Sequence, residues 1–330
     1  MKGNIEYLNK INNRIENLLK ENNEQYYVGF YHFITNNVSP STAYNYLNYI
    51  IDFIKSSDKD VREIELDDYT AFLSGIVTKS SSYQIAVYSA LKQFSLYLKA
   101  SKKNERNSMQ YIRRPKAKES IVTKTKRANG YLNKAEIQQY IDAVECGVGS
   151  ARAIKRQERW RERDVAIVMM FLNTGMRCSA LYKLDVEDID LVHMKLTTVD
   201  KGTKINYYEI SDDLADILRD WLNKRENILH GKADESALFI SNMRTRMTQS
   251  AISDVVKKYA KNIKGKKITP HKLRATYGTQ LYEATKDIVL VRDAMKHSNT
   301  RVTELYIRNG VNNNEKVASN IMSNIIFNNK

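Results

Sequence analysis

The chain has 330 residues, which is enough for two domains with cores of their own. Its 53 Lys and Arg against 38 Asp and Glu give a formal net charge of +15, which favours a polyanionic partner: nucleic acid first, an anionic membrane surface second. No apolar run reaches about 18 residues and residues 1–20 do not resemble a secretory signal, which argues against a membrane or secreted protein. The only cysteines, Cys146 and Cys178, form neither a disulfide framework nor a zinc-ligand spacing, and fit a reducing cytoplasm.

The first third of the chain reads as helical, because prolines are few and apolar residues recur at helical spacing. We expect helices over residues 5–19, 26–34, 40–54, 67–76 and 83–98. Ser39 is the expected N-cap of the third helix, with Pro40 at its first position. These patterns predict an extra N-terminal helix within residues 1–24 and a small all-α domain over residues 25–105.

Residues 101–130 carry ten basic and only two acidic residues, and Pro115 interrupts them. We interpret residues 106–130 as a flexible basic linker that lies along a phosphate backbone. A solvated linker that touches nothing is the alternative. The expected DNA-contacting side chains are Arg113, Arg114, Lys116, Lys118, Lys124, Lys126 and Arg127.

Residues 131–310 mix helices with a hairpin, so we expect a second, α+β domain. Helices are predicted over residues 132–144, 165–172, 213–229 and 248–263, a charged, solvated helix start over residues 152–163, and a short buried strand over residues 237–240. Alternating residues 194–199 and 203–210 predict two strands around a turn that contains Lys201 and Gly202. An apolar helix within residues 311–330 completes the chain. The fold class is mainly α with a small antiparallel sheet, in two domains: an all-α domain and an α+β domain.

Two short motifs place cations at the ends of helices. Thr269 is a good N-cap, so His271 and Arg274 fall three apart in the opening turns of a helix, whose free N–H groups favour a phosphate. Upstream, Gly175 ends a buried helix and lets the chain turn sharply, which directs Arg177 away from a rigid helix end.

In order, Thr-Gly-Met-Arg at 174–177, the hairpin lysine, His-x-x-Arg at 271–274, a Lys-His-Ser turn and a tyrosine nine residues later resemble the tyrosine recombinases, the phage-integrase family. The resemblance assigns the catalytic roles to Arg177, Lys201, His271, Arg274, His297 and Tyr306. Lys204 is the second candidate for the lysine. Ala180 stands where the family usually has an acidic residue. Residues 25–105 resemble the family's core-binding domain only loosely. The resemblance implies that this domain and the catalytic domain over residues 131–310 together clamp DNA.

The resemblance implies attack by Tyr306 on a DNA phosphodiester, giving a 3′-phosphotyrosine and a 5′-hydroxyl, with Lys201 as general acid and two arginines as a clamp on the phosphate oxygens. No metal and no other cofactor is expected. The implied partner is double-stranded DNA with inverted-repeat core sites, bound by a homotetramer through a Holliday junction, with residues 311–330 docking on a neighbouring protomer. The expected location is the cytoplasm, on the nucleoid.

Other interpretations stay open. A catalytically idle DNA-binding protein would keep the fold, and a type IB topoisomerase-like enzyme would use the same chemistry without pairing sites. A basic membrane-surface protein is disfavoured, because no basic helix has a broad apolar face. The sequence does not distinguish a mobile-element integrase from a chromosome-dimer resolvase. It also leaves open the DNA target, the directionality and the accessory proteins.

Overall fold

A computed structural model describes residues 24–116, 130–199, 205–230, 235–260, 263 and 266–296. The chain divides into two compact units, residues 1–120 and 121–330. Several predictions fall outside the described residues: the helix over 5–19, the tail over 311–330, Lys118, Lys124, Lys126, Arg127, Lys201, Lys204, His297 and Tyr306. No helix among the described ranges is long and apolar enough to cross a membrane.

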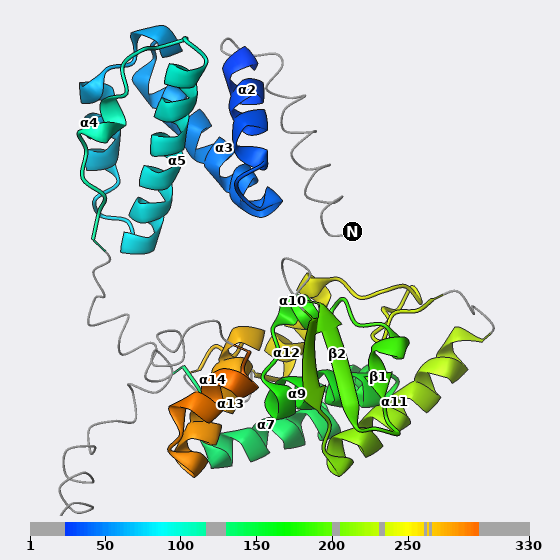
Figure 1. The fold of residues 1–330 in the computed structure, drawn as a ribbon. Helices are drawn as coiled ribbons and strands as arrows, with labels where there is room; N and C mark the ends of the chain where they lie inside the picture. Colours follow the sequence, from blue (N-terminus) through cyan, green and yellow to red (C-terminus); the bar gives the residue numbers. More distant parts are fainter. Residues whose placement is uncertain are drawn as a thin grey trace, which may run out of the picture. The chain divides into compact units, whose positions relative to one another are not determined.

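The described part of the first unit is all-α, as predicted (Figure 1). Its elements are α2 (Glu24–Thr35), α3 (Pro40–Ser57), a 3-10 turn (Val61–Glu63), α4 (Leu66–Gly75), α5 (Ser81–Ala100) and a second 3-10 turn (Ser108–Gln110). Ser39 caps α3 and Ser80 caps α5, each by accepting a backbone N–H with its hydroxyl. Aromatic rings fill the core, where Phe30 and Phe94 meet edge to face at 5.3 Å.

The segment after α5 folds back onto the first unit. Asn104, only 6% exposed, donates its amide hydrogens to the carbonyls of Val61 and Ile64. Met109 is fully buried, and the Tyr88 hydroxyl donates to the Ile112 carbonyl at 2.8 Å. The predicted flexible linker therefore does not begin at residue 106, and we place its start after residue 112.

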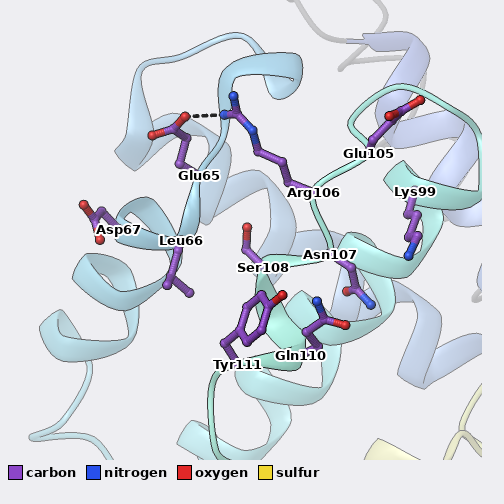
Figure 2. A pocket seen from close by; sticks show the side chains of 10 residues that line it. All are labelled: Glu65, Leu66, Asp67, Lys99, Glu105, Arg106, Asn107, Ser108, Gln110 and Tyr111. Carbon is purple, nitrogen blue, oxygen red and sulfur yellow. Dashed lines mark hydrogen bonds and ion pairs between the residues drawn. The ribbon is translucent and has the colours of Figure 1, made fainter.

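This return also forms a pocket of about 440 Å³ beside the start of α4 and the end of α5. Figure 2 shows the ion pair of Glu65 and Arg106 at its rim and the largely exposed ring of Tyr111 across from it. None of the predicted site residues lines the pocket.

The second unit combines helices with one small antiparallel sheet, which confirms the predicted fold class (Figure 1). Its elements are α7 (Lys134–Cys146), α8 (Ala151–Glu158), α9 (Arg161–Thr174), α10 (Cys178–Leu181), a 3-10 turn (Val186–Asp188), β1 (Ile189–Asp190), β2 (Lys195–Val199), β3 (Ile205–Glu209), α11 (Asp212–Leu229), α12 (Gln249–Tyr259), α13 (Pro270–Thr285) and α14 (Ile288–Ala294). Helix α9 packs against α7, α11 and α13 and is the centre of the core.

The sheet has the order β1-β2-β3, and its alternation separates two faces. Leu196 pairs with Tyr208 and Thr198 with Asn206, and all four side chains are buried. Two predictions need correction or extension here. Residues 237–240 are buried but form only isolated bridges, to Asp185 and Arg246, so the predicted strand is absent. The two-residue β1 and helix α14 were not predicted.

The predicted solvated helix start over residues 152–163 holds for α8, which has no buried residue, and fails at its end, because Arg163 is buried beside Asp164. The Arg163 guanidinium donates twice to Asp164 Oδ1, at 2.9 and 2.8 Å, and its carbon lies 4.3 Å from the Trp160 ring centroid. Lys258 and Tyr259 of α12 donate to Asp164 Oδ2 at 2.7 and 2.8 Å. The fully buried carboxylate of Asp164 therefore joins the start of α9 to the end of α12. The run of charged residues in the sequence had predicted that this segment faces solvent.

We expect Asp164→Asn to destabilise the second unit by about 3 kcal/mol, because it leaves the buried Arg163 without its counter-charge. Both tryptophans, Trp160 and Trp221, lie in this unit, so urea unfolding followed by tryptophan emission reports on it alone. Asp216→Asn is the matched control: its ion pair with Arg219 is exposed, and its loss should change little. Equal effects of the two substitutions would contradict the structural role of Asp164.

Candidate active site

Helix α13 carries two of the predicted site residues. The Thr269 side chain accepts the N–H of Lys272 and Pro270 occupies the first position, as the sequence predicts. His271 lies exposed at this helix start, and Arg274, one turn further on, is only 2% exposed. The His-x-x-Arg pair therefore places an imidazole at the surface and a guanidinium beneath it.

Arg274 joins α13 to two other segments of the unit. Its Nη1 donates to the carbonyl of Gly175, and its Nη2 donates to the carbonyl of Met295 at 2.6 Å. Gly175 lies two residues before Arg177, and Met295 lies two residues before His297. The buried guanidinium thus fixes the backbone from which two further predicted site residues continue.

The turn before Arg177 is tightly built. Gly175 adopts φ +59 and its N–H donates to Phe171 at 3.0 Å, which closes α9 as predicted. The Thr174 hydroxyl donates to the Met170 carbonyl at 2.5 Å and accepts the N–H of Met176 at 3.2 Å. Arg177 then caps α10 with extended backbone, φ −77 and ψ 145.

The ring of Tyr277 occupies the space that a side chain at residue 175 would need. A Cβ on Gly175 would lie 2.2 Å from Tyr277 Cδ1, so the contact requires glycine for space as well as for backbone conformation. Burial raises the pKa of the Tyr277 phenol, and the charge of Arg274 partly offsets that rise. This aromatic lid on the turn was missed by sequence reasoning, because nothing in a lone tyrosine indicates which glycine it covers.

The third segment ends helix α14. Met295 is fully buried, and its sulfur lies so close to Gly278 that an added Cβ there would approach it to 2.5 Å. Lys296 follows with φ +54, a left-handed conformation. The position of this turn depends on α14, which is only seven residues long, and sequence reasoning missed it.

Of the six predicted catalytic residues, three are described: Arg177, His271 and Arg274. The structure ties the Arg177 turn to Arg274, while Lys201, His297 and Tyr306 stay sequence predictions. Ala180 is 4% exposed within α10, so the position that resembles the family's acidic one is buried here. In the first unit, Arg113, Arg114 and Lys116 are exposed.

Two neighbouring groups have shifted pKa values. Burial lowers the pKa of Lys272, and the nearby charge of Lys266 lowers it further. Burial raises the pKa of the Cys178 thiol to about 11, which keeps it protonated and unreactive beside Arg177. Within the described ranges, no group of three or more His, Cys, Asp or Glu side chains is placed to hold a metal ion.

Comparison with known proteins agrees with this geometry. A family model described as the phage integrase family matches residues 131–313. The chain belongs to the phage integrase family. The matched residues span every described helix and strand of the second unit, including the turn before Arg177 and helix α13, so the predicted resemblance is confirmed.

Individual members of the phage integrase family place the chain near the tyrosine recombinases. It is 33% identical over 208 residues to tyrosine recombinase XerS of Streptococcus agalactiae, and the alignment covers 61% of this chain and 58% of the relative. It is 32% identical over 246 residues to tyrosine recombinase XerS of Streptococcus gordonii, which covers 70% of this chain and 68% of that relative. The chain thus spans just under three fifths of the length of the first of these.

Solved structures of other phage integrase family members share the fold. A complex of XerH site-specific recombinase with a palindromic difH substrate aligns with a TM-score of 0.65 and 20% identity, over 85% of this chain and 79% of that one. A lambda integrase dimer bound to a core site aligns with a TM-score of 0.61 and 17% identity, over 86% and 76%.

We expect Gly175→Ala to destabilise the second unit by about 3 kcal/mol, since it adds backbone strain at positive φ to a clash with Tyr277. Gly149→Ala is the matched control: its φ is +98, but its nearest contact would be an ordinary 3.6 Å, so only strain of about 1–2 kcal/mol is expected. The measurement is urea unfolding followed by tryptophan emission.

A double variant tests the cause. In Gly175→Ala combined with Tyr277→Ala, the clash is gone, and the two effects should fall short of additivity. Additive effects, or equal costs at Gly175 and Gly149, would show that Tyr277 does not cover the turn.

Proposed function

We propose that this protein is a site-specific DNA recombinase that cleaves and rejoins strands through a 3′-phosphotyrosine intermediate. The observation that carries the proposal is the buried Arg274, which donates to the carbonyls of Gly175 and Met295. This one side chain connects three of the segments whose order along the chain resembles the family's active site. Family membership supports the same conclusion.

The proposed reaction uses two guanidinium groups as a clamp. Arg177 and Arg274 bind the non-bridging oxygens of the scissile phosphate and stabilise the charge of the pentacoordinate transition state. The two hydrogen bonds to backbone carbonyls fix the orientation of the Arg274 guanidinium plane before DNA binds. Stabilisation of the transition state requires this pre-organisation. His297 donates a hydrogen bond to the same phosphate.

Proton transfers accompany the attack. The Tyr306 oxygen forms a bond to phosphorus while its proton passes to His271, and the phosphorus–O5′ bond breaks with its electron pair going to O5′. Lys201 protonates that oxygen, which leaves as a 5′-hydroxyl. Attack by a 5′-hydroxyl of the partner duplex reverses each step and releases Tyr306. The phosphotyrosine linkage retains the bond energy, so the reaction needs neither ATP nor a metal ion.

The same proposal covers the assembly. Solved relatives of this fold include a lambda integrase tetramer bound to a Holliday junction and XerH bound to a palindromic substrate. We infer that four copies of this chain act on two duplexes with inverted-repeat core sites, in the cytoplasm on the nucleoid. The basic linker, which begins after residue 112, lies along the DNA backbone, and residues 311–330 dock on a neighbouring protomer.

A second candidate is a catalytically idle DNA-binding protein of the same fold. One observation favours it: Ala180 is buried where the family usually has an acidic residue that supports the active-site cations. A type IB topoisomerase-like enzyme is the third candidate, and would form the same adduct without joining two sites.

We expect the wild-type protein to form an SDS-stable adduct with nicked duplexes drawn from a pool of inverted repeats with randomised arms, and Tyr306→Phe to form none, because only the phenol oxygen can attack phosphorus. Tyr282→Phe is the control and should retain the adduct. EDTA should leave the yield unchanged. Sequencing the trapped DNA gives the site and the scissile phosphate.

The outcomes of this experiment separate the three candidates. DNA binding by the wild type without any adduct would establish the idle protein. An adduct that persists in Tyr306→Phe would show that another residue is the nucleophile. Adduct formation without recombination of two such sites would favour the topoisomerase-like enzyme.

The linker proposal predicts a change in salt dependence. Replacing Arg113, Arg114 and Lys116 by Gln should reduce the slope of log K against log salt by about 2–3, since each lost phosphate contact contributes about 0.9. Replacing three exposed cations of α8, Arg152, Lys155 and Arg156, removes the same charge and is the control. Equal changes in both variants would mean that net charge, and not the linker, governs binding.

A further inference from the structure

Lys296 holds a backbone conformation that favours another residue type. Its φ is +54, in the left-handed region where a glycine would sit without strain and a lysine does not. The turn is firmly built, because the Lys296 N–H donates to the Asp293 carbonyl at 3.1 Å and the preceding Met295 carbonyl accepts from Arg274. The Lys296 side chain leaves this fixed turn and makes a contact with an aromatic ring.

That contact lies on strand β3. The Lys296 ammonium is 5.6 Å from the centroid of the Tyr208 ring, within the range of a cation–π interaction. Tyr208 is 7% exposed and points to the buried face of the sheet, paired across the ladder with Leu196 on β2. A largely buried ring keeps water away from the ammonium on that side and strengthens the attraction.

The contact joins the two segments that lead to the remaining cations of the site. Lys296 immediately precedes His297, and Tyr208 lies three residues from the start of β3, on the hairpin whose connecting residues 200–204 include Lys201. On the other side, Met295 is held to α13 by Arg274 and by its packing on Gly278. The hairpin is therefore linked, through Lys296, to the segment that Arg274 fixes.

We infer that Lys296 is a positioning residue that holds the β2–β3 hairpin against the turn before His297 and so aligns the general acid Lys201 with the leaving oxygen. The inference rests on the proposed function for its catalytic part. Its structural part, the link between turn and hairpin, stands independently of that function.

The structural part is tested without DNA, by amide hydrogen exchange of residues 205–209. Lys296→Met keeps a long side chain and the same backbone strain but removes the charge, so exchange there should rise about two- to thirtyfold, the equivalent of a cation–π contact. Lys286→Met is a matched control: Lys286 also has φ +56, and its ammonium lies 5.7 Å from the ring of Tyr282 on its own helix, away from the hairpin. Unchanged exchange in Lys296→Met would overturn the inference.

The catalytic part is tested on the site recovered from the trapped adduct. Lys296→Met should slow adduct formation by about two- to thirtyfold with DNA affinity little changed, and Lys286→Met should not slow it. Tyr208→Leu should slow it similarly, Tyr208→Phe, which keeps an aromatic ring, should slow it less than Tyr208→Leu, and the double variant of Lys296→Met and Tyr208→Leu should be no slower than either single one. Additive losses would assign Lys296 to the DNA instead of to Tyr208.

A modified substrate identifies the step that is affected. With sulfur in place of the bridging 5′-oxygen, the leaving thiolate needs no proton, so a defect in delivering Lys201 disappears. Lys296→Met should therefore regain the wild-type rate on this substrate, whereas a protein weakened only in folding would not. Failure to regain it would overturn the assignment to Lys201. A wild type that forms no adduct would refute the proposed function, and hydrogen exchange would still decide the link.

Discussion

One buried guanidinium organises the second unit around the candidate site. Arg274 brings a full positive charge into an interior position, and two backbone carbonyls accept its hydrogens there. Leaving such a charge without acceptors would cost several kcal/mol, so the ends of α9 and α14 must lie where their carbonyls reach it. The same requirement that stabilises the fold therefore sets the geometry of the site.

The described elements differ in how much of their structure is local, and this decides how well the sequence predicted them. The starts of α3 and α13 were predicted correctly, because a capping hydroxyl followed by an apolar face acts within one turn of helix. The left-handed Gly175 was predicted for the same reason. The sheet strands β2 and β3 followed from simple alternation.

The errors arose where distant contacts decide. Arg163 sits in a run of charges and was expected in solvent, but it pairs with the buried Asp164, whose other oxygen accepts from Lys258 and Tyr259, nearly a hundred positions away in α12. Residues 237–240 have the composition of a strand. However, the side chains of Trp221 and Arg225 donate hydrogen bonds to two of their backbone carbonyls, where a neighbouring strand would otherwise donate. The return of residues 104–112 likewise depends on backbone carbonyls of an earlier turn. For the candidate site, the sequence predicted the residues and their order, and the structure adds the bonds from Arg274 to Gly175, before Arg177, and to Met295.

The connections made by Arg274 end on main-chain oxygens. Every residue has such an oxygen, so the identities of Gly175 and Met295 are constrained by space and backbone shape and not by the hydrogen bonds they accept. During divergence, these two positions can change without a compensating change in the arginine. Methods that infer contacts from correlated substitutions would consequently pass over the most important junction in this unit.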